Sequence, residues 1–248
     1  MKKLLFITLA LLSAFTFAQE EIKHEPVANK ADYYIGSFNE RKDMDDLMKW
    51  AADHQSWLNQ SELYDSMSSS ILVPYFISDT TQHDVVWLNI WPSATKQYAG
   101  LENWLKNGAK QLNKSPITSS QVVDTWQWAV SEPEGEGEVG MVRYSDCKLK
   151  DGVTKLKAFS AIKDFAIAAR EEGDNLGRKM IFPTAGGRDG DYDYVYAIYA
   201  NNAAQLGSGS DLYWEKIYGS DEDLALNDII DSCSNYRTYS SMEIRAAK

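Results

Sequence analysis

The chain has 248 residues, a formal net charge of −11 and only three histidines. A strongly acidic chain repels phosphate backbones and anionic lipid surfaces, so neither nucleic acid nor a membrane is an expected partner. A hydrophobic content of 44% with 12% aromatic residues is ample for a packed core and too rich for a disordered chain.

Residues 1–18 are predicted to be a signal peptide. Lys2 and Lys3 precede an apolar run, and small residues stand at the usual positions before a cut after Ala18. The run is too short for a comfortable membrane span. We therefore expect an exported, soluble protein, periplasmic or secreted, in which residues 19–31 form a flexible polar tail.

The predicted elements follow the same order in both halves of the chain. The first half reads as strand 33–39, helix 43–58, strands 71–77 and 84–91, helix 94–113 and strand 122–130. The second half reads as strand 140–149, helix 154–170, strands 179–183 and 193–200, a helical region over 210–232 and strand 236–244.

An internal repeat supports this reading. Pro74 stands ten positions before Asp84, and Pro183 stands ten positions before Asp193. Shifting the chain by 109 residues superposes the two motifs. The repeats are placed at 32–130 and 139–248, joined by the Glu- and Gly-rich linker 131–138.

Each half has the order β-α-β-β-α-β, which is the ferredoxin-like unit. Two such units in one chain resemble the dimeric α+β barrel superfamily in its tandem-fused form. The resemblance implies an α+β fold in which two four-stranded antiparallel sheets face each other and the helices cover the outside. Two separate ferredoxin-like domains remain the alternative. Because the chain supplies both halves of a barrel, we expect a monomer.

Alternating side chains give the strand at 84–91 two different faces. Val86, Leu88 and Ile90 form an apolar face that we assign to the layer beneath the helices. The opposite face is aromatic with one amide, and we assign it to the barrel interior together with aromatic residues of other strands. The predicted ligand-binding set is Trp87, Asn89, Trp91, Trp126, Trp128 and Tyr196. The competing interpretation is that these rings only fill space.

The two cysteines are predicted to form a disulfide. In the β-α-β-β-α-β unit the first and last strands are antiparallel neighbours, which brings Cys147 near Cys233. An oxidising compartment makes the disulfide the natural state of such a pair. A catalytic dithiol would need a spacing such as Cys-x-x-Cys, which this chain lacks.

Few residues offer acid–base or metal chemistry. His54 shares a helical face with Leu47, Ala51 and Leu58, which is typical of a core histidine. Barrel relatives that bind haem or abstract protons use an inward histidine, so His54 and Asn89 are the catalytic candidates that the resemblance leaves open. The chain has no histidine pair suited to zinc, and we expect no metal and no cofactor.

Two loop-like motifs are interpreted as ordinary structure. The Asp-rich stretch 188–193 lacks the glutamate of a calcium loop and is predicted to be a hairpin turn. The stretch 207–211, "GSGSD", lacks a phosphate-loop lysine and is predicted to be a flexible entry to a helix capped by Ser210 or Asp211.

The sequence is compatible with three functions. The first is binding of a small aromatic or apolar ligand in the barrel cavity, which we rank ahead because no acid–base pair stands out. The second is a cofactor-independent enzyme resembling the antibiotic-biosynthesis monooxygenases of the superfamily. The third is a structural or interaction protein with a fully packed barrel.

Overall fold

The computed structural model describes residues 23–78 and 82–248. The predicted signal peptide and the first part of the predicted tail therefore lie outside the described residues. Within the described ranges, no helix is both long and apolar enough to cross a membrane.

The elements of the first half match the predicted order. They are β1 (Val27–Phe38), α1 (Met44–Leu58), a 3₁₀ turn (Glu62–Tyr64), β2 (Ser68–Phe76), β3 (Val85–Trp91), α2 (Ala94–Asn107), α3 (Ala109–Leu112) and β4 (Ile117–Ser131). Asp43 and Ser93 start the two long helices, because each side chain accepts a hydrogen bond from an otherwise unpaired backbone N–H of the first turn.

The second half follows the same order with a more broken last helical region. It contains β5 (Gly140–Leu149), α4 (Lys155–Glu171), β6 (Gly177–Ala185), β7 (Tyr194–Ala200), α5 (Ala203–Leu212), a π-helical turn (Tyr213–Ile217), α6 (Asp221–Asn227) and β8 (Ile230–Arg245).

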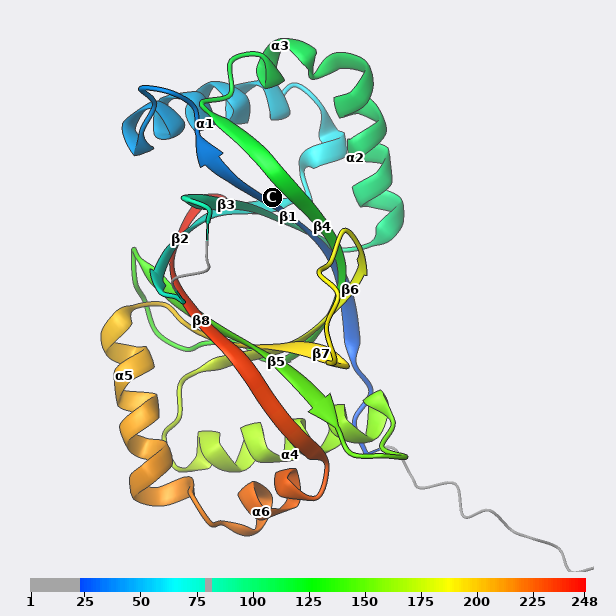
Figure 1. The fold of residues 1–248 in the computed structure, drawn as a ribbon, viewed down its shortest axis with the longest axis vertical. Helices are drawn as coiled ribbons and strands as arrows, with labels where there is room; N and C mark the ends of the chain where they lie inside the picture. The colour runs from blue at the N-terminus through cyan, green and yellow to red at the C-terminus, as the bar shows by residue number, and fades with distance from the viewer. Residues whose placement is uncertain (1–22, 79–81) are drawn as a thin grey trace, which may run out of the picture.

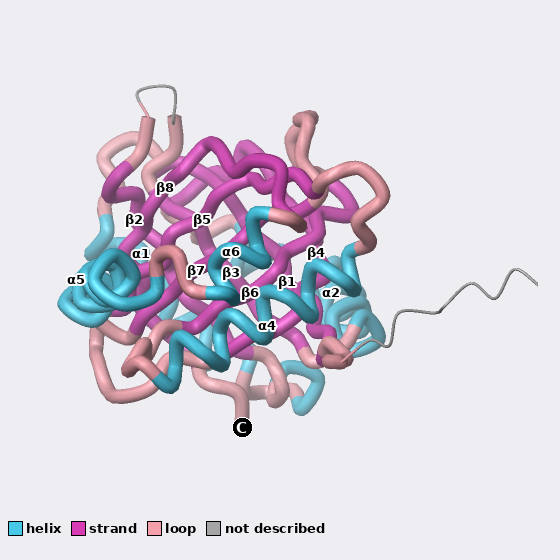
Figure 2. Tube along the Cα trace, turned by 90° about the horizontal axis from the view of Figure 1, so that it is seen from below, coloured by secondary structure: helices cyan, strands magenta, loops and turns pink. Residues whose placement is uncertain are grey.

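All eight strands form one closed antiparallel barrel in the order β1-β3-β2-β8-β5-β7-β6-β4. The four strands of each half are contiguous, and the halves join where β2 pairs with β8 and where β4 pairs with β6. Figure 1 shows the strands as a ring, with α1, α2 and α3 on one outer side and α4, α5 and α6 on the opposite side. Seen from below, helices flank the crossing strands (Figure 2). The fold is therefore mixed α+β, as predicted.

The barrel interior carries the opposite strand face from the one that we predicted. Val86 and Leu88 belong to a cluster built from seven of the eight strands, whose other buried members are Ala31, Leu72, Val142, Tyr144, Ile181, Val195, Ala197 and Tyr239. Trp87 instead packs against Leu47 and Ala51 of α1, outside the barrel. An eight-stranded barrel is only just wide enough for side chains to fill. Aliphatic residues share its interior with Tyr144 and Tyr239, whereas Trp87 lies in the layer between sheet and helix.

The same correction applies to Trp128 and Tyr196, which we also assigned to the interior. Both pack on the outer cluster that contains Phe159 and Ile162 of α4. Trp126 points outward as well, at 36% exposure, with the Lys30 ammonium 5.0 Å from its ring centroid.

The repeated aspartates have one structural role in the two halves. The Asp84 carboxylate accepts a hydrogen bond from the Phe38 backbone N–H at 2.9 Å, at the end of β1. The Asp193 carboxylate accepts one from the Leu149 N–H at 2.7 Å, at the end of β5. Each aspartate thus ties the start of one strand to the end of its neighbour, which explains the repeated Pro-to-Asp spacing without a ligand.

Two boundaries differ from the predicted ones. β1 starts at Val27, so the last residues of the predicted tail are strand, and His24 bonds to Asp164 of α4 at 2.9 Å. The "GSGSD" stretch is not the entry to a helix: it lies inside α5, which Asn202 starts by capping the Gln205 N–H. Glycine is favoured at 209 because the Leu176 side chain would lie 2.5 Å from an added Cβ.

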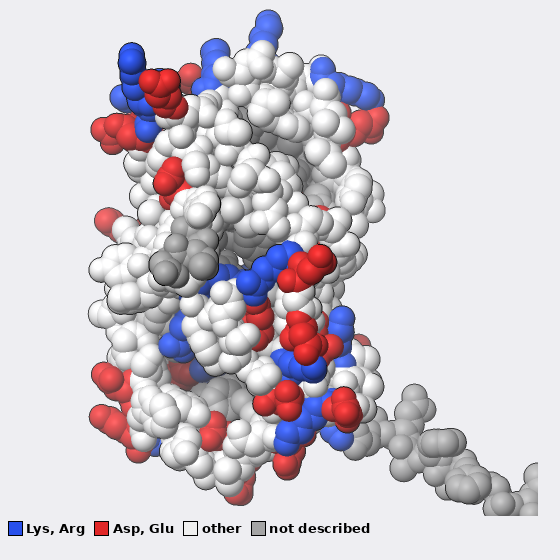
Figure 3. Space-filling model, in the orientation of Figure 1, with Lys and Arg blue, Asp and Glu red and all other residues white. Residues whose placement is uncertain are grey.

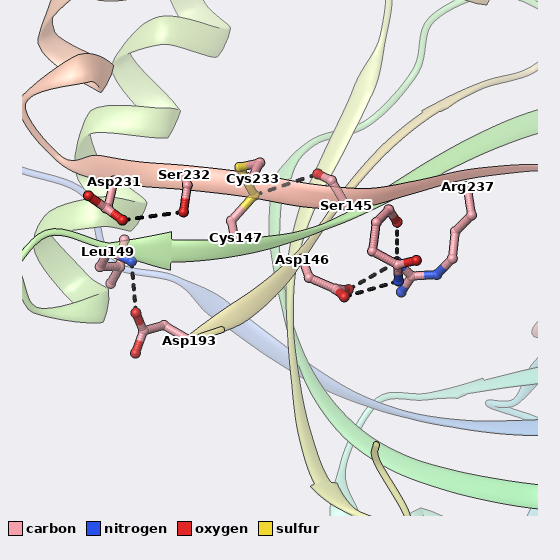
Figure 4. Close-up of a disulfide and its surroundings, with 10 residues drawn as sticks. Ser145, Asp146, Cys147, Leu149, Asp193, Asp231, Ser232, Cys233 and Arg237 are labelled. Atoms are coloured by element: carbon pink, nitrogen blue, oxygen red, sulfur yellow. Dashed lines mark hydrogen bonds and ion pairs between the residues drawn. A yellow bond between two sulfur atoms is a disulfide. The ribbon is translucent and has the colours of Figure 1, made fainter. Parts of the chain in front are cut away.

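The predicted disulfide is present. Cys147 on β5 and Cys233 on β8 are direct cross-strand partners, with Cα atoms 4.1 Å apart. Figure 4 shows the bond between the two strands, beside the Asp193 contact to Leu149. Cys147 is fully buried, so the bond also belongs to the core beneath α4.

Replacing both cysteines by serine is expected to lower the free energy of unfolding by about 2–4 kcal/mol. The bond closes a loop of 86 residues, for which the chain-entropy limit is about 4–5 kcal/mol. Urea unfolding of the oxidised protein and of the double variant measures the difference. Intact mass, lower by two hydrogens than that of the reduced chain, verifies the starting state. Equal urea midpoints for the two proteins would contradict the prediction.

Candidate functional site

A cavity of about 630 Å³ lies on the outer face of the first half of the barrel, beneath α1 and α2. Its floor is the outward face of β1, β3 and β4, and its walls come from the two helices. The residues that define it are Asp32, Tyr34, Trp50, His54, Tyr64, Trp87, Asn89, Trp91, Gln97, Gly100, Leu101, Trp104, Val122 and Asp124. This cavity lies in the layer between sheet and helices, outside the barrel interior in which we predicted the ligand site.

Strand register places the floor side chains in pairs. Asp32 lies opposite Asn89 and also opposite Asp124, while Tyr34 lies opposite Trp87. Directly opposite residues on one face of a sheet are close enough for their side chains to interact. The cavity floor is thus a row of cross-strand pairs. Because side chains alternate between the two faces of each strand, these pairs on β1, β3 and β4 all face the helices.

Four tryptophan rings line the cavity, and the N–H groups of three of them are bonded to the protein. The Trp87 indole donates to Asn89 Oδ1 at 2.8 Å, and Trp91 donates to Asp32 Oδ1 at 2.7 Å. Trp50 donates to the Gln111 carbonyl at 3.0 Å. These hydrogen bonds fix the ring orientations, so the rings offer the cavity their carbon surfaces rather than their donors.

Asn89 is the centre of a buried polar network. Its Oδ1 accepts from Ser69 Oγ at 2.7 Å and from Trp87, while its Nδ2 donates to Asp32 Oδ2 at 2.8 Å. An amide offers two acceptor and two donor sites, so three of the four are in use. Asn89 therefore orients Asp32 and Trp87, and it has little capacity left for a substrate.

Asp32 is a buried carboxyl group whose partners are all neutral. It is 7% exposed and accepts hydrogen bonds from Asn89, Trp91 and Gln97. Burial raises its pKa above the usual value, against the lowering effect of these hydrogen bonds, and the charge of Asp124 adds to the rise. The pKa of Tyr34 is raised by burial and by the Asp32 carboxylate, to which its hydroxyl is hydrogen-bonded.

Asp124 has the opposite electrostatic setting. Burial alone would raise its pKa, but hydrogen bonds from Lys30, Thr184 and Gln97 outweigh this and lower it. The Lys30 ammonium is buried and lies 2.7 Å from Asp124 Oδ2. Asp124 is thus a paired carboxylate at the cavity edge, beside the cation-free Asp32.

His54 sits among the aromatic rings in a neutral form. Its imidazole stacks on Trp50 at 4.7 Å between centroids, and the edges of Trp87 and Trp104 meet it at 5.7 and 5.4 Å. Its Nδ1 is buried without a partner among the described residues. Burial lowers the pKa of His54 to about 4, and the charge of Arg245 contributes.

The structure brings together half of the predicted ligand-binding set. Trp87, Asn89 and Trp91 line the cavity, and the candidate His54 joins them. Trp126, Trp128 and Tyr196 do not line it. Sequence reasoning missed the cavity residues Asp32, Tyr34, Trp50, Gln97 and Trp104. Asp32 was placed at the boundary of the predicted tail, although its alternation with Tyr34 along the strand was a usable signal.

A smaller cavity of about 320 Å³ lies at one mouth of the barrel. Arg188 and Arg237 line it, and both form ion pairs with the buried Asp146. No group of three His, Cys, Asp or Glu residues suited to a metal ion occurs in the part of the chain that the structure describes. The larger first-half cavity is therefore the main candidate site.

A closed eight-stranded antiparallel barrel with helices on its outer faces defines the fold of this chain. No protein-family model and no curated protein matches the sequence.

Known structures resemble this fold at very low sequence identity. Two variants of the chlorite dismutase from Candidatus Nitrospira defluvii match with TM-scores of 0.51 and 0.52, at 10% and 8% identity. The matches cover 90% and 91% of this chain, and 94% and 95% of theirs. A heme-binding protein from Thermus thermophilus matches with a TM-score of 0.48 at 10% identity, over 89% of this chain and 95% of that one. At these identities the two dismutase matches show a shared fold alone.

The first-half cavity does not fit haem. Its lining carries the carboxylates Asp32 and Asp124, and none of the described lining residues is a lysine or an arginine that could pair with the propionates of a haem. A metal-ligating histidine normally donates its second ring N–H to an acceptor, whereas Nδ1 of His54 has none among the residues described. We therefore assign no haem to this cavity.

His54→Phe is expected to remove part of the pH dependence of stability between pH 6.5 and 4. The folded-state pKa of about 4 lies below the usual 6.5, so the unfolded chain binds the proton first as pH falls. As pH falls through this window, His54 should therefore lower the free energy of unfolding by up to about 3 kcal/mol. Urea unfolding at several pH values tests this, with His83→Phe, at a half-exposed histidine, as the comparison. An unchanged slope in His54→Phe would disprove it.

Proposed function

We propose that the protein binds a small aromatic or apolar molecule in the cavity beneath α1 and α2. The observation that carries the proposal is a 630 Å³ space lined by Trp50, Trp87, Trp91 and Trp104. Small-molecule sites fall in this size range and combine apolar walls with a few placed polar groups. Asp32 and Gln97 are such groups here.

The proposal includes export and a monomeric state. Export is supported by the sequence of residues 1–18 and by the Cys147–Cys233 disulfide, which is typical of oxidising compartments. The monomer is supported by barrel closure within one chain, which leaves no open sheet edge to pair with a second copy.

We further propose that the barrel consists of two ferredoxin-like repeats, at 32–130 and 139–248. The matching strand orders β4-β1-β3-β2 and β8-β5-β7-β6 support this division. So do the equivalent contacts of Asp84 and Asp193 with the ends of β1 and β5. The acidic linker 131–138 follows β4 and leads to β5.

Binding ranks ahead of the two alternatives. A cofactor-independent oxygenase would need Asn89 free to orient a substrate, but its amide already makes three hydrogen bonds within the protein. A purely structural role would not require a cavity, yet the layer beneath α1 and α2 contains one. His54, with a neutral ring on the cavity wall, is the residue on which an enzymatic function would rest.

Leu101→Trp is expected to weaken binding of naphthalene at least about tenfold, because the larger ring occupies the cavity. Leu105→Trp is the matched control, since Leu105 lies one turn further along α2 and is 75% exposed. Quenching of tryptophan fluorescence reports binding, because four tryptophans line the space.

A native mass spectrum of the protein purified from its export compartment provides an independent test. An excess mass that disappears on denaturation is the expected result. Absence of naphthalene binding to the wild type, together with a bare native mass, would refute the proposed function. Equal weakening by both tryptophan variants would refute the proposed location.

A further inference from the structure

One carboxylate at the first-half cavity has no cation among its described partners. Lys30 is paired with Asp124, with the ammonium 2.6 Å from Asp124 Oδ1. Arg245, the cation whose charge reaches His54, donates to Asn59 Oδ1 at 2.6 Å and to the Tyr64 carbonyl at 3.1 Å, with Asp65 4.0 Å away. Asp32 alone keeps a buried carboxylate with no cation among its described partners.

Three of the four indole donors of the lining are already in use. The indole N–H groups of Trp50, Trp87 and Trp91 are bonded inside the protein. Gln97 uses its Nε2 to donate to Asp32 and Asp124, which leaves its buried Oε1 without a partner among the described residues. A ligand that needs donors from the protein, such as an anion, is poorly served by this surface.

Aromatic rings and a carboxylate together favour one ligand chemistry. The faces of tryptophan and tyrosine attract cations through the ring quadrupole, more strongly where water is excluded. A buried carboxylate becomes favourable once a cation pairs with it. The cavity supplies both, with Trp87 and Trp91 on the floor, Trp50 and Trp104 on the walls, and Asp32 between β3 and β4.

We infer that the ligand of this cavity is an organic cation, a substituted ammonium group carried on an apolar or aromatic body, with Asp32 as its counter-charge. The inference rests on the proposed function and adds the charge of the ligand to it. Burial raises the pKa of Asp32 above its usual value, as expected for a carboxyl group that lacks its cationic partner. On the face seen in Figure 3, lysines and arginines are interspersed with acidic residues.

Two probes of nearly equal shape separate charge from shape. Phenyltrimethylammonium carries the positive charge, and tert-butylbenzene is its neutral carbon analogue. Titration of each into the whole protein, followed by tryptophan fluorescence and calorimetry, is expected to show at least about tenfold tighter binding of the cation. Asp32→Asn should remove most of this preference for the cation over tert-butylbenzene.

Asp53→Asn is the control for net charge, because Asp53 lies on the exposed face of α1 and does not line the cavity. It should change neither affinity. Equal or tighter binding of tert-butylbenzene to the wild type would overturn the cation inference and leave the proposed function intact. Failure of both probes to bind would overturn both. The comparison of the two probes on the wild-type protein tests the cation inference even if Asp32→Asn does not fold.

Discussion

Closure of the barrel is the constraint on which the rest of the structure depends. Once β2 pairs with β8 and β4 pairs with β6, each strand has one face inside a narrow cylinder and one face outside. The inside is then filled by residues such as Val86 and Val195. Tyr144 and Tyr239 also fit there, whereas Trp87, Trp91 and Trp128 lie in the two layers between sheet and helices. The first-half cavity follows from this division.

The two outer layers are used differently. The strand pairs show the difference: Asp32 lies opposite Asn89 in the first half, whereas Arg143 lies opposite Ile198 in the second, and Ala200 takes the place of Trp91. The carboxylate and amide of the first half therefore have no counterpart in the second. There, Phe159 and Ile162 of α4 pack on Trp128 and Tyr196 in a closed cluster, and the disulfide adds Cys147. One half serves as a core, and the other half holds the cavity.

Much of this architecture could be predicted from the sequence, because it depends on order and adjacency. The elements, the repeated Pro-to-Asp spacing and the neighbouring positions of Cys147 and Cys233 all follow from the β-α-β-β-α-β pattern. Alternation also separated Val86 from Trp87 correctly. It could not tell which face is inside, since a period of two defines two faces and only the barrel diameter decides between them. The missed residues Asp32 and Gln97 are polar, and polar residues are mostly exposed. Asp32 is buried because of the register between β1 and β3, and Gln97 because α2 packs against β1. Local sequence contains neither of these contacts.

The network around Asn89 explains why the cavity persists rather than collapsing. Tryptophan fills a core well only if its indole N–H finds an acceptor. Here Asn89 and Asp32 supply those acceptors and thereby hold Trp87 and Trp91 in fixed orientations. Gly100 of α2 completes the arrangement, because a Cβ there would lie 2.4 Å from the Trp91 ring. The rings are positioned before any ligand arrives, so binding need not spend free energy on ordering them.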